Sequence, residues 1–158
     1  MGDEEKLIAT NRQASRRYGL RDSYEAGLVL VGSEVKSLRE AKGVQLTESY
    51  ADVSQSGEMW LRSLHIAAYT HAQDHSGHEP TRPRKMLLHR LELDRIAAKV
   101  AQERLSIVPL RLYFKGSRVK VEFALGKPKK TVDRRRDIAE RDVKRETERE
   151  LARSAKQR

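Results

Sequence analysis

Residues 126–158 contain almost nothing that a hydrophobic core could bury. In this segment 13 Lys and Arg stand against 7 Asp and Glu, so it holds +6 of the chain's net charge of +10. As a helix it would offer only three large apolar residues, Ile138, Val143 and Leu151, too few for a core-facing stripe. We therefore expect two parts, a folded domain in residues 1–125 and a basic tail in residues 126–158.

The tail nevertheless has helical spacing between opposite charges. Pairs such as Glu140 with Lys144 and Asp142 with Arg145 are four or three residues apart, and each stabilises an isolated helix by only ~0.2–0.5 kcal/mol. Since helices that are polar all round seldom stand alone, we expect a tail that is disordered in the free protein and helical on a polyanion. A solvated tail that only improves solubility fits the charge equally well.

Overall composition restricts the class of protein. The chain has 33 Lys and Arg and a pI near 10, which favours nucleic acid, and less strongly an anionic membrane surface, as partner. The absence of cysteine excludes disulfides and thiolate zinc sites. No apolar run approaches the ~18–20 residues that span a bilayer, and the first residues lack the apolar region of a secretory signal. These features predict a cytoplasmic protein that binds nucleic acid and no membrane.

Between residues 24 and 125 the apolar pattern is mostly that of strands. Residues 24–31 suit a strand buried on both faces, and residues 50–66 suit two strands around a turn at Ser56 and Gly57. In residues 118–125 one face is apolar. Pro109 lies in the strand that precedes this one, and that strand should be an edge strand or carry a bulge at Pro109. The residues expected to face inward in the last strand are Val119, Val121, Phe123 and Leu125.

Two helices interrupt the strands. One follows Ser33, a candidate N-cap, and stops at Gly43; the other lies within residues 87–103. About six short strands and two helices predict a mainly β fold, a small antiparallel OB-like barrel with peripheral helices. Such barrels commonly hold single-stranded or looped RNA. From strand count alone this topology is one of several possibilities.

A histidine-rich stretch follows the middle strands. Its histidines lie at i, i+4 and i+7 with carboxylates beside them, as some zinc sites do. Because Gly77 and Pro80 disfavour a continuous helix, we interpret it as a polar loop and predict no metal site. The residues concerned are His71, Asp74, His75, His78 and Glu79.

The next segment places Arg82, Arg84 and Lys85 beside two prolines. Prolines restrict the backbone, so these cations could be held in place for phosphate rather than wave in solvent; an ordinary solvated loop is the alternative. We find no nucleophile and base in a recognisable arrangement and no glycine-rich phosphate loop. The sequence therefore predicts no catalytic residue and no cofactor.

Several stretches in the right order resemble the small protein B (SmpB) family, the bacterial partners of transfer-messenger RNA in ribosome rescue. The most specific are EAGLVLVGSEVKSLR, RKMLLHR and LYFKGSRVKVE, and NRQASRRY and DRRRDIAERDVKRE also match. The resemblance runs from about Leu7 to the C-terminus. It implies an OB-like barrel that binds the tRNA-like domain of transfer-messenger RNA. It also implies a tail that enters the empty mRNA path of a stalled 70S ribosome as a helix, contacting its rRNA. The protein would be a monomeric adaptor without enzymatic activity.

Residue roles follow from the motif match. Asn11 would read or buttress an RNA loop, Glu25 would accept hydrogen bonds from bases, orient an arginine or be a buried ion-pair partner, and Leu87 would shape the surface by packing. The full set implied for RNA binding is Asn11, Arg12, Glu25, Lys36, Arg39, Arg82, Arg84, Lys85 and Leu87.

The tail contains the residues implied for ribosome binding. Two positions depart from the family pattern: Pro128 replaces a glycine before two lysines, and Val132 stands where members often carry His or Tyr. The second departure removes a side chain that could stack on a base. The implied ribosome-binding residues are Lys129, Lys130, Asp133, Arg134 and Arg135.

Two other classes of function remain possible at this stage. A nucleic-acid packager would use the same charge without specificity, and would bind any polyanion with a similar salt dependence. An enzyme on an OB-like barrel would need a cluster of titrating groups, which only the histidine-rich stretch could supply.

Overall fold

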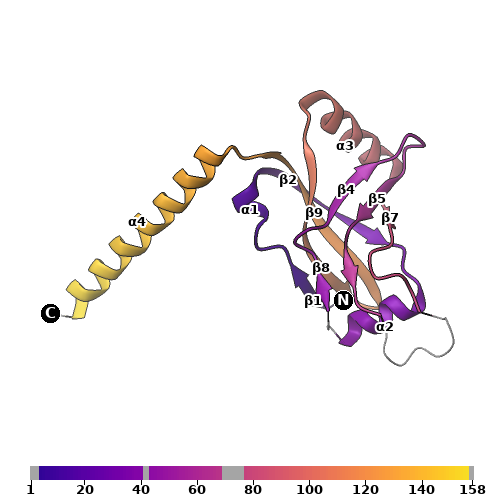
Figure 1. Cartoon of the computed structure of the whole chain (residues 1–158), viewed down its shortest axis with the longest axis horizontal. Coiled ribbons are helices and arrows are strands. Elements are labelled where there is room, and N and C mark those ends of the chain that lie inside the picture. Colours follow the sequence, from indigo (N-terminus) through magenta and orange to yellow (C-terminus); the bar gives the residue numbers. More distant parts are fainter. Residues whose placement is uncertain (1–3, 41–42, 69–76, 157–158) are drawn as a thin grey trace.

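The structure is a computed structural model that describes residues 4–40, 43–68 and 77–156. Its described part is mainly β, with helices at the periphery (Figure 1). The strands are β1 (Glu5–Thr10), β2 (Tyr18–Leu28), β3 (Val44–Gln45), β4 (Tyr50–Val53), β5 (Met59–Arg62), β6 (His65–Ile66), β7 (Arg84–Leu87), β8 (Ser106–Lys115) and β9 (Arg118–Pro128). The helices are α1 (Ala14–Arg17), α2 (Gly32–Glu40), α3 (Arg90–Glu103) and α4 (Thr131–Lys156).

The strands of the main sheet form a closed ring. Its order is β1-β8-β4-β5-β7-β2-β9, and β8 also pairs with β9. Among the described residues, six strands from β8 round to β9 therefore form a closed antiparallel ring, and β1 is added outside it, against β8. This confirms the predicted mainly β, antiparallel fold class with peripheral helices.

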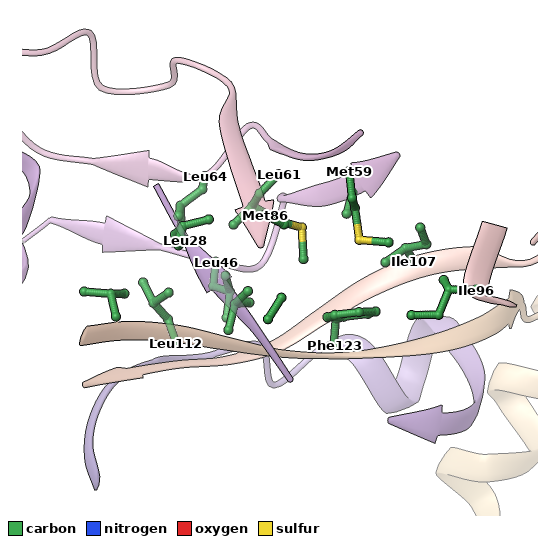
Figure 2. Close-up of a cluster of buried hydrophobic side chains, with 14 of the residues drawn as sticks. Leu28, Leu46, Met59, Leu61, Leu64, Met86, Ile96, Ile107, Leu112 and Phe123 are labelled. Atoms are coloured by element: carbon green, nitrogen blue, oxygen red, sulfur yellow. The ribbon is translucent and has the colours of Figure 1, made fainter. Parts of the chain in front are cut away.

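The core lies between the two sides of this ring. In Figure 2, Met59 of β5 and Met86 of β7 face Leu112 of β8 and Phe123 of β9. All four side chains are at most 2% exposed, and Ile96 of α3 closes one end of the cluster. Burial of large apolar side chains, each worth about 1.5–3 kcal/mol, is what holds the ring together.

Several details of the predicted strands are confirmed. All four residues expected to face inward in β9 are buried. The turn between β4 and β5 contains Gly57 with φ of 84°, as a Ser-Gly turn requires. The register of β8 against β9 shifts between Pro109 and Arg111, which is the bulge that a proline without an amide hydrogen demands.

The prediction for residues 24–31 was wrong in part. The strand starts earlier, at Tyr18, and ends at Leu28; Val29 and Val31 are 44% and 45% exposed. Val29 still donates its amide to the Lys85 carbonyl of β7 at 2.9 Å. Val29 and Val31 are exposed because they follow Glu25 and Gly27 on the face of the strand that points away from the core. The strand β1 was not predicted because its alternation is weak, and one of its two large apolar residues, Leu7, is 55% exposed.

Helix α2 starts at Gly32, so Ser33 is not its N-cap. The Ser33 hydroxyl lies 2.9 Å from Nδ1 of His78 instead. The carboxylate of Glu34 accepts the Val31 amide at 3.0 Å and so satisfies one of the free donors at the helix start. Gly43 has φ of 63°, the left-handed conformation expected after a helix.

The tail forms a single helix, α4, which projects away from the sheet (Figure 1). The structure of the chain alone contains this helix, whereas the sequence led us to expect a helix only on a polyanion. Its apolar residues Ile138, Val143 and Leu151 are 52–66% exposed. Strand β9 pairs as far as Pro128, and the Lys129 amide donates to the Arg17 carbonyl at 2.8 Å. Over the described residues, no helix is long and apolar enough to cross a membrane.

Candidate nucleic-acid interface

The strand register brings Glu25 and Leu87 to one surface. Gly27 lies opposite Leu87 of β7 and opposite Lys120 of β9, and Glu25 points to the same face two residues earlier. The surface here has a hollow of about 730 Å³, which we call the Gly27 hollow. The lining residues are Glu25, Gly27, Leu28, Leu30, Val35, Leu87, Leu88, His89, Glu92, Ser117, Arg118, Val119 and Lys120.

Gly27 leaves the floor of this hollow open. A Cβ atom there would lie 3.3 Å from Cβ of Leu87 and 3.7 Å from Nζ of Lys120. Leu87 is 52% exposed, so it offers an apolar surface beside the cations Arg118 and Lys120. An apolar floor with cations at its rim can take an unstacked base together with its phosphate.

The carboxylate of Glu25 has two partners within the protein. The Tyr113 hydroxyl donates to Oε2, and Nζ of Lys115 lies 3.5 Å from Oε1. The Tyr113 hydrogen bond lowers the pKa of Glu25, and the nearby charges of Lys115 and Lys120 add to that effect against a smaller opposing effect of burial. Burial and the bond to Glu25 raise the pKa of Tyr113. At neutral pH, therefore, a carboxylate and a neutral phenol face each other.

The prediction that Arg84 contacts phosphate needs correction. Its side chain is fully buried, and its Nε lies 2.5 Å from Oε2 of Glu34. Its remaining donors bond the carbonyls of Leu64 and Pro80. All three nitrogens of the guanidinium bond within the protein and none of the side chain is exposed, so Arg84 holds the fold and offers no surface to a phosphate.

Arg82 shares the same carboxylate but lies nearer the surface. Its Nε and Nη2 atoms are 3.1 and 2.5 Å from Oε1 of Glu34, and its side chain is 29% exposed. Lys85 is 42% exposed, with Nζ 3.4 Å from Glu58. Lys36 and Arg39 are exposed on α2. These four residues remain proposed RNA contacts.

Asn11 lies at a second hollow, of about 720 Å³, that shares no lining residue with the first. It is 8% exposed, its Nδ2 donates to the Pro109 carbonyl at 3.0 Å, and its Oδ1 accepts the Gln13 amide at 3.2 Å. The amide therefore ties the start of α1 to the bulge in β8. Arg12, next to it, is exposed.

The histidine-rich stretch lies mostly outside the described residues, which include His78 and Glu79 but not His71, Asp74 or His75. His78 has its Nδ1 2.9 Å from the Ser33 hydroxyl and its Nε2 2.9 Å from the Ile66 carbonyl. Within residues 4–40, 43–68 and 77–156, no three His, Asp or Glu residues gather as metal ligands.

Residues implied for ribosome binding surround the start of α4. Lys130 and Arg135 are exposed, and Lys129 is half-buried where the chain leaves β9. Asp133 and Arg134 belong to the first turn of the helix. Their roles remain proposals.

Sequence reasoning missed Lys120 and Arg118, which line the same hollow as Glu25, and Tyr113, whose buried hydroxyl bonds Glu25. The alternation of residues 118–125 predicted that Lys120 faces outward, but it did not show that β9 lies beside β2. That pairing joins residues 93 positions apart in sequence, Gly27 and Lys120, so no local pattern contains it.

Comparison with known proteins places this geometry in a family. The family described as SmpB protein matches residues 8–153. An SsrA-binding protein of Mycolicibacterium smegmatis is 48% identical over 151 residues, covering 96% of this chain and 92% of the relative. One from Roseiflexus castenholzii is 47% identical over 152 residues, covering 96% and 95%. A solved chain described as "tmRNA-SmpB: a journey to the center of the bacterial ribosome" has 41% identity and a TM-score of 0.62. The match covers 78% of this chain and 85% of that chain.

Proposed function

The chain belongs to the SmpB protein family, and we propose that it is an RNA-binding adaptor of trans-translation. The protein binds the tRNA-like domain of transfer-messenger RNA and brings this RNA to stalled ribosomes. Relatives named for SsrA binding and the structural neighbour on the bacterial ribosome support both partners. As a ribosome partner it works in the cytoplasm, and as an adaptor it performs no chemical reaction.

The observation that carries the RNA-binding role is the surface around Gly27. It joins an exposed apolar side chain, Leu87, to a cation, Lys120, and to the fixed carboxylate of Glu25. Phosphate contacts position an RNA and polar contacts to bases select it. A cation beside an acceptor and an apolar surface supplies both kinds of contact, which a surface of cations alone does not.

The charge pattern of α4 supports a role for the tail on rRNA. Arg141, Arg145, Arg149 and Arg153 follow one another at four-residue steps, and all are exposed. Residues four apart lie on the same side of a helix, so these cations form a band along α4. A band of arginines matches a row of phosphates, and Arg favours bidentate phosphate contact.

Deletion of residues 131–158 tests the division between sheet domain and tail. The cut leaves β9 and its pairing through Pro128 intact. We expect the shortened protein to bind the tRNA-like domain as the full chain does and to support no peptide tagging on stalled ribosomes. Tagging at the normal level would overturn the proposed role of the tail.

A matched variant separates the arginine band from net charge. Combining E140R, R141E, R145E and E146R keeps the composition of the tail but moves two cations off the band. If the band contacts rRNA, tagging falls toward the level of the deletion while binding to the tRNA-like domain is unchanged. Full tagging would show that charge alone suffices.

A further inference from the structure

We propose that Tyr113 is a positioning residue for RNA binding, because its hydroxyl holds the Glu25 carboxylate in one orientation at the rim of the Gly27 hollow. This inference rests on the proposed function, since it assumes that the hollow receives RNA. It assigns a role to a buried side chain on β8 that does not itself line the hollow.

Tyr113 is held at its hydroxyl and at its ring. It is 2% exposed, and its hydroxyl donates to Oε2 of Glu25. The guanidinium carbon of Arg111 lies 4.9 Å from the centre of its ring. Arg111 is in turn held by Oε2 of Glu122, 2.9 Å from its Nε and 2.6 Å from its Nη2. A ring packed in this way has little freedom to follow a moving carboxylate.

A carboxylate near phosphates binds RNA only if it is aimed at hydrogen-bond donors. Glu25 lies close to Lys115 and, through Gly27, to Lys120, and either ammonium could draw a free carboxylate away. Each carboxylate oxygen accepts more than one hydrogen bond, so Oε2 can keep Tyr113 and still accept a base amino group. The lowered pKa of Glu25 keeps the acceptor charged.

The competing explanation is that Glu25 only satisfies the buried Tyr113 hydroxyl, with no consequence for RNA binding. A double-mutant cycle distinguishes this from a positioning role. Affinity for the tRNA-like domain is measured for the full chain, Y113F, E25A and the double variant. We expect E25A and Y113F each to weaken binding, by about tenfold for the loss of a bond to a charged group. In the E25A background, Y113F then has no further effect.

Tyr24→Phe is the matched control. Tyr24 precedes Glu25 on β2 and stacks on Phe123 with ring centres 5.7 Å apart, so its side chain points to the opposite face. The Tyr24→Phe variant also loses one tyrosine hydroxyl, but it should bind RNA like the unaltered protein. Carboxyl NMR titration adds a second readout, since the pKa of Glu25 should rise in Y113F.

Three outcomes would overturn the inference. If E25A weakens binding and Y113F does not, Tyr113 has no positioning role and the RNA site stands. If Y113F weakens binding equally with and without Glu25, it acts through the fold. If E25A leaves affinity unchanged, Glu25 makes no RNA contact for Tyr113 to position and the inference fails, whereas the RNA-binding function fails only if the unaltered protein does not bind the tRNA-like domain.

Discussion

Glu34 and Arg84 form an ion pair with no solvent-exposed side-chain surface, in which Nε of Arg84 lies 2.5 Å from Oε2 of Glu34. Arg82 bonds the other carboxylate oxygen. The pair joins α2 to β7, two elements that flank the Gly27 hollow. A segment whose cations suggested RNA binding therefore has, at its centre, an arginine that holds the structure.

Breaking this pair should destabilise the protein strongly. Glu34→Gln leaves a buried guanidinium without its counter-charge, and we expect the free energy of unfolding to fall by about 3–5 kcal/mol. Urea unfolding measures it, with Glu40→Gln on the exposed side of the same helix as control. A loss within about 0.5 kcal/mol, as at an ordinary surface position, would contradict the account.

The same carboxylate predicts how stability depends on pH. Burial alone would raise the pKa of Glu34, but hydrogen bonds from Arg82, the Val31 amide and Arg84 lower it below its ordinary value of 4.5. A carboxyl with a lower pKa in the folded state adds stability above its unfolded pKa. That stability is lost as the pH falls through the folded-state pKa. The unchanged protein should thus lose stability in acid, below about pH 4.5, more steeply than Glu34→Gln. If the urea midpoints of the unaltered protein and of Glu34→Gln fall in parallel as the pH is lowered through this range, the effect is ruled out.

The exposed side chain of Leu87 should contribute to RNA binding. Leu87→Ala removes apolar area at the hollow, and we expect weaker binding to the tRNA-like domain with stability nearly unchanged, because the side chain is 52% exposed. Leu91, 73% exposed and outside the hollow, gives the control Leu91→Ala. Equal affinities of the two variants would remove Leu87 from the interface.

How far the sequence predicts this structure can be judged from two strands. The alternation in residues 118–125 correctly predicted the buried face of β9, since a period of two is a local property. For residues 24–31 the same reasoning expected burial on both faces, yet Val29 and Val31 are exposed. Both side chains lie on the face of the strand that points away from the core, and which face of a strand is covered depends on the tertiary fold.

The candidate site shows the same limit. Motif resemblance indicated Glu25 and Leu87 separately, and the register of β2 with β7 brings them together. It also indicated Arg84, whose burial no spacing reveals, because its partner Glu34 lies 50 residues earlier. A cation in sequence becomes an RNA contact or a structural ion pair only through what the fold places beside it.

Lys120 should account for one phosphate contact. Lys120→Ala is expected to reduce the slope of log affinity against log salt by about one, because one fewer counterion is released. Lys99→Ala is the control, since Lys99 lies on α3 beside Asp22 and outside the hollow. A slope identical to that of the unchanged protein would mean that Lys120 makes no phosphate contact.

We propose that this protein recognises a particular RNA shape rather than negative charge in general. Competition binding at physiological salt tests it most directly, with labelled tRNA-like domain challenged by excess duplex DNA and by unrelated structured RNA. We predict that neither competitor displaces the label at concentrations at which the unlabelled domain does. Displacement by all three at equal concentration would contradict the account and leave a nonspecific nucleic-acid packager in its place.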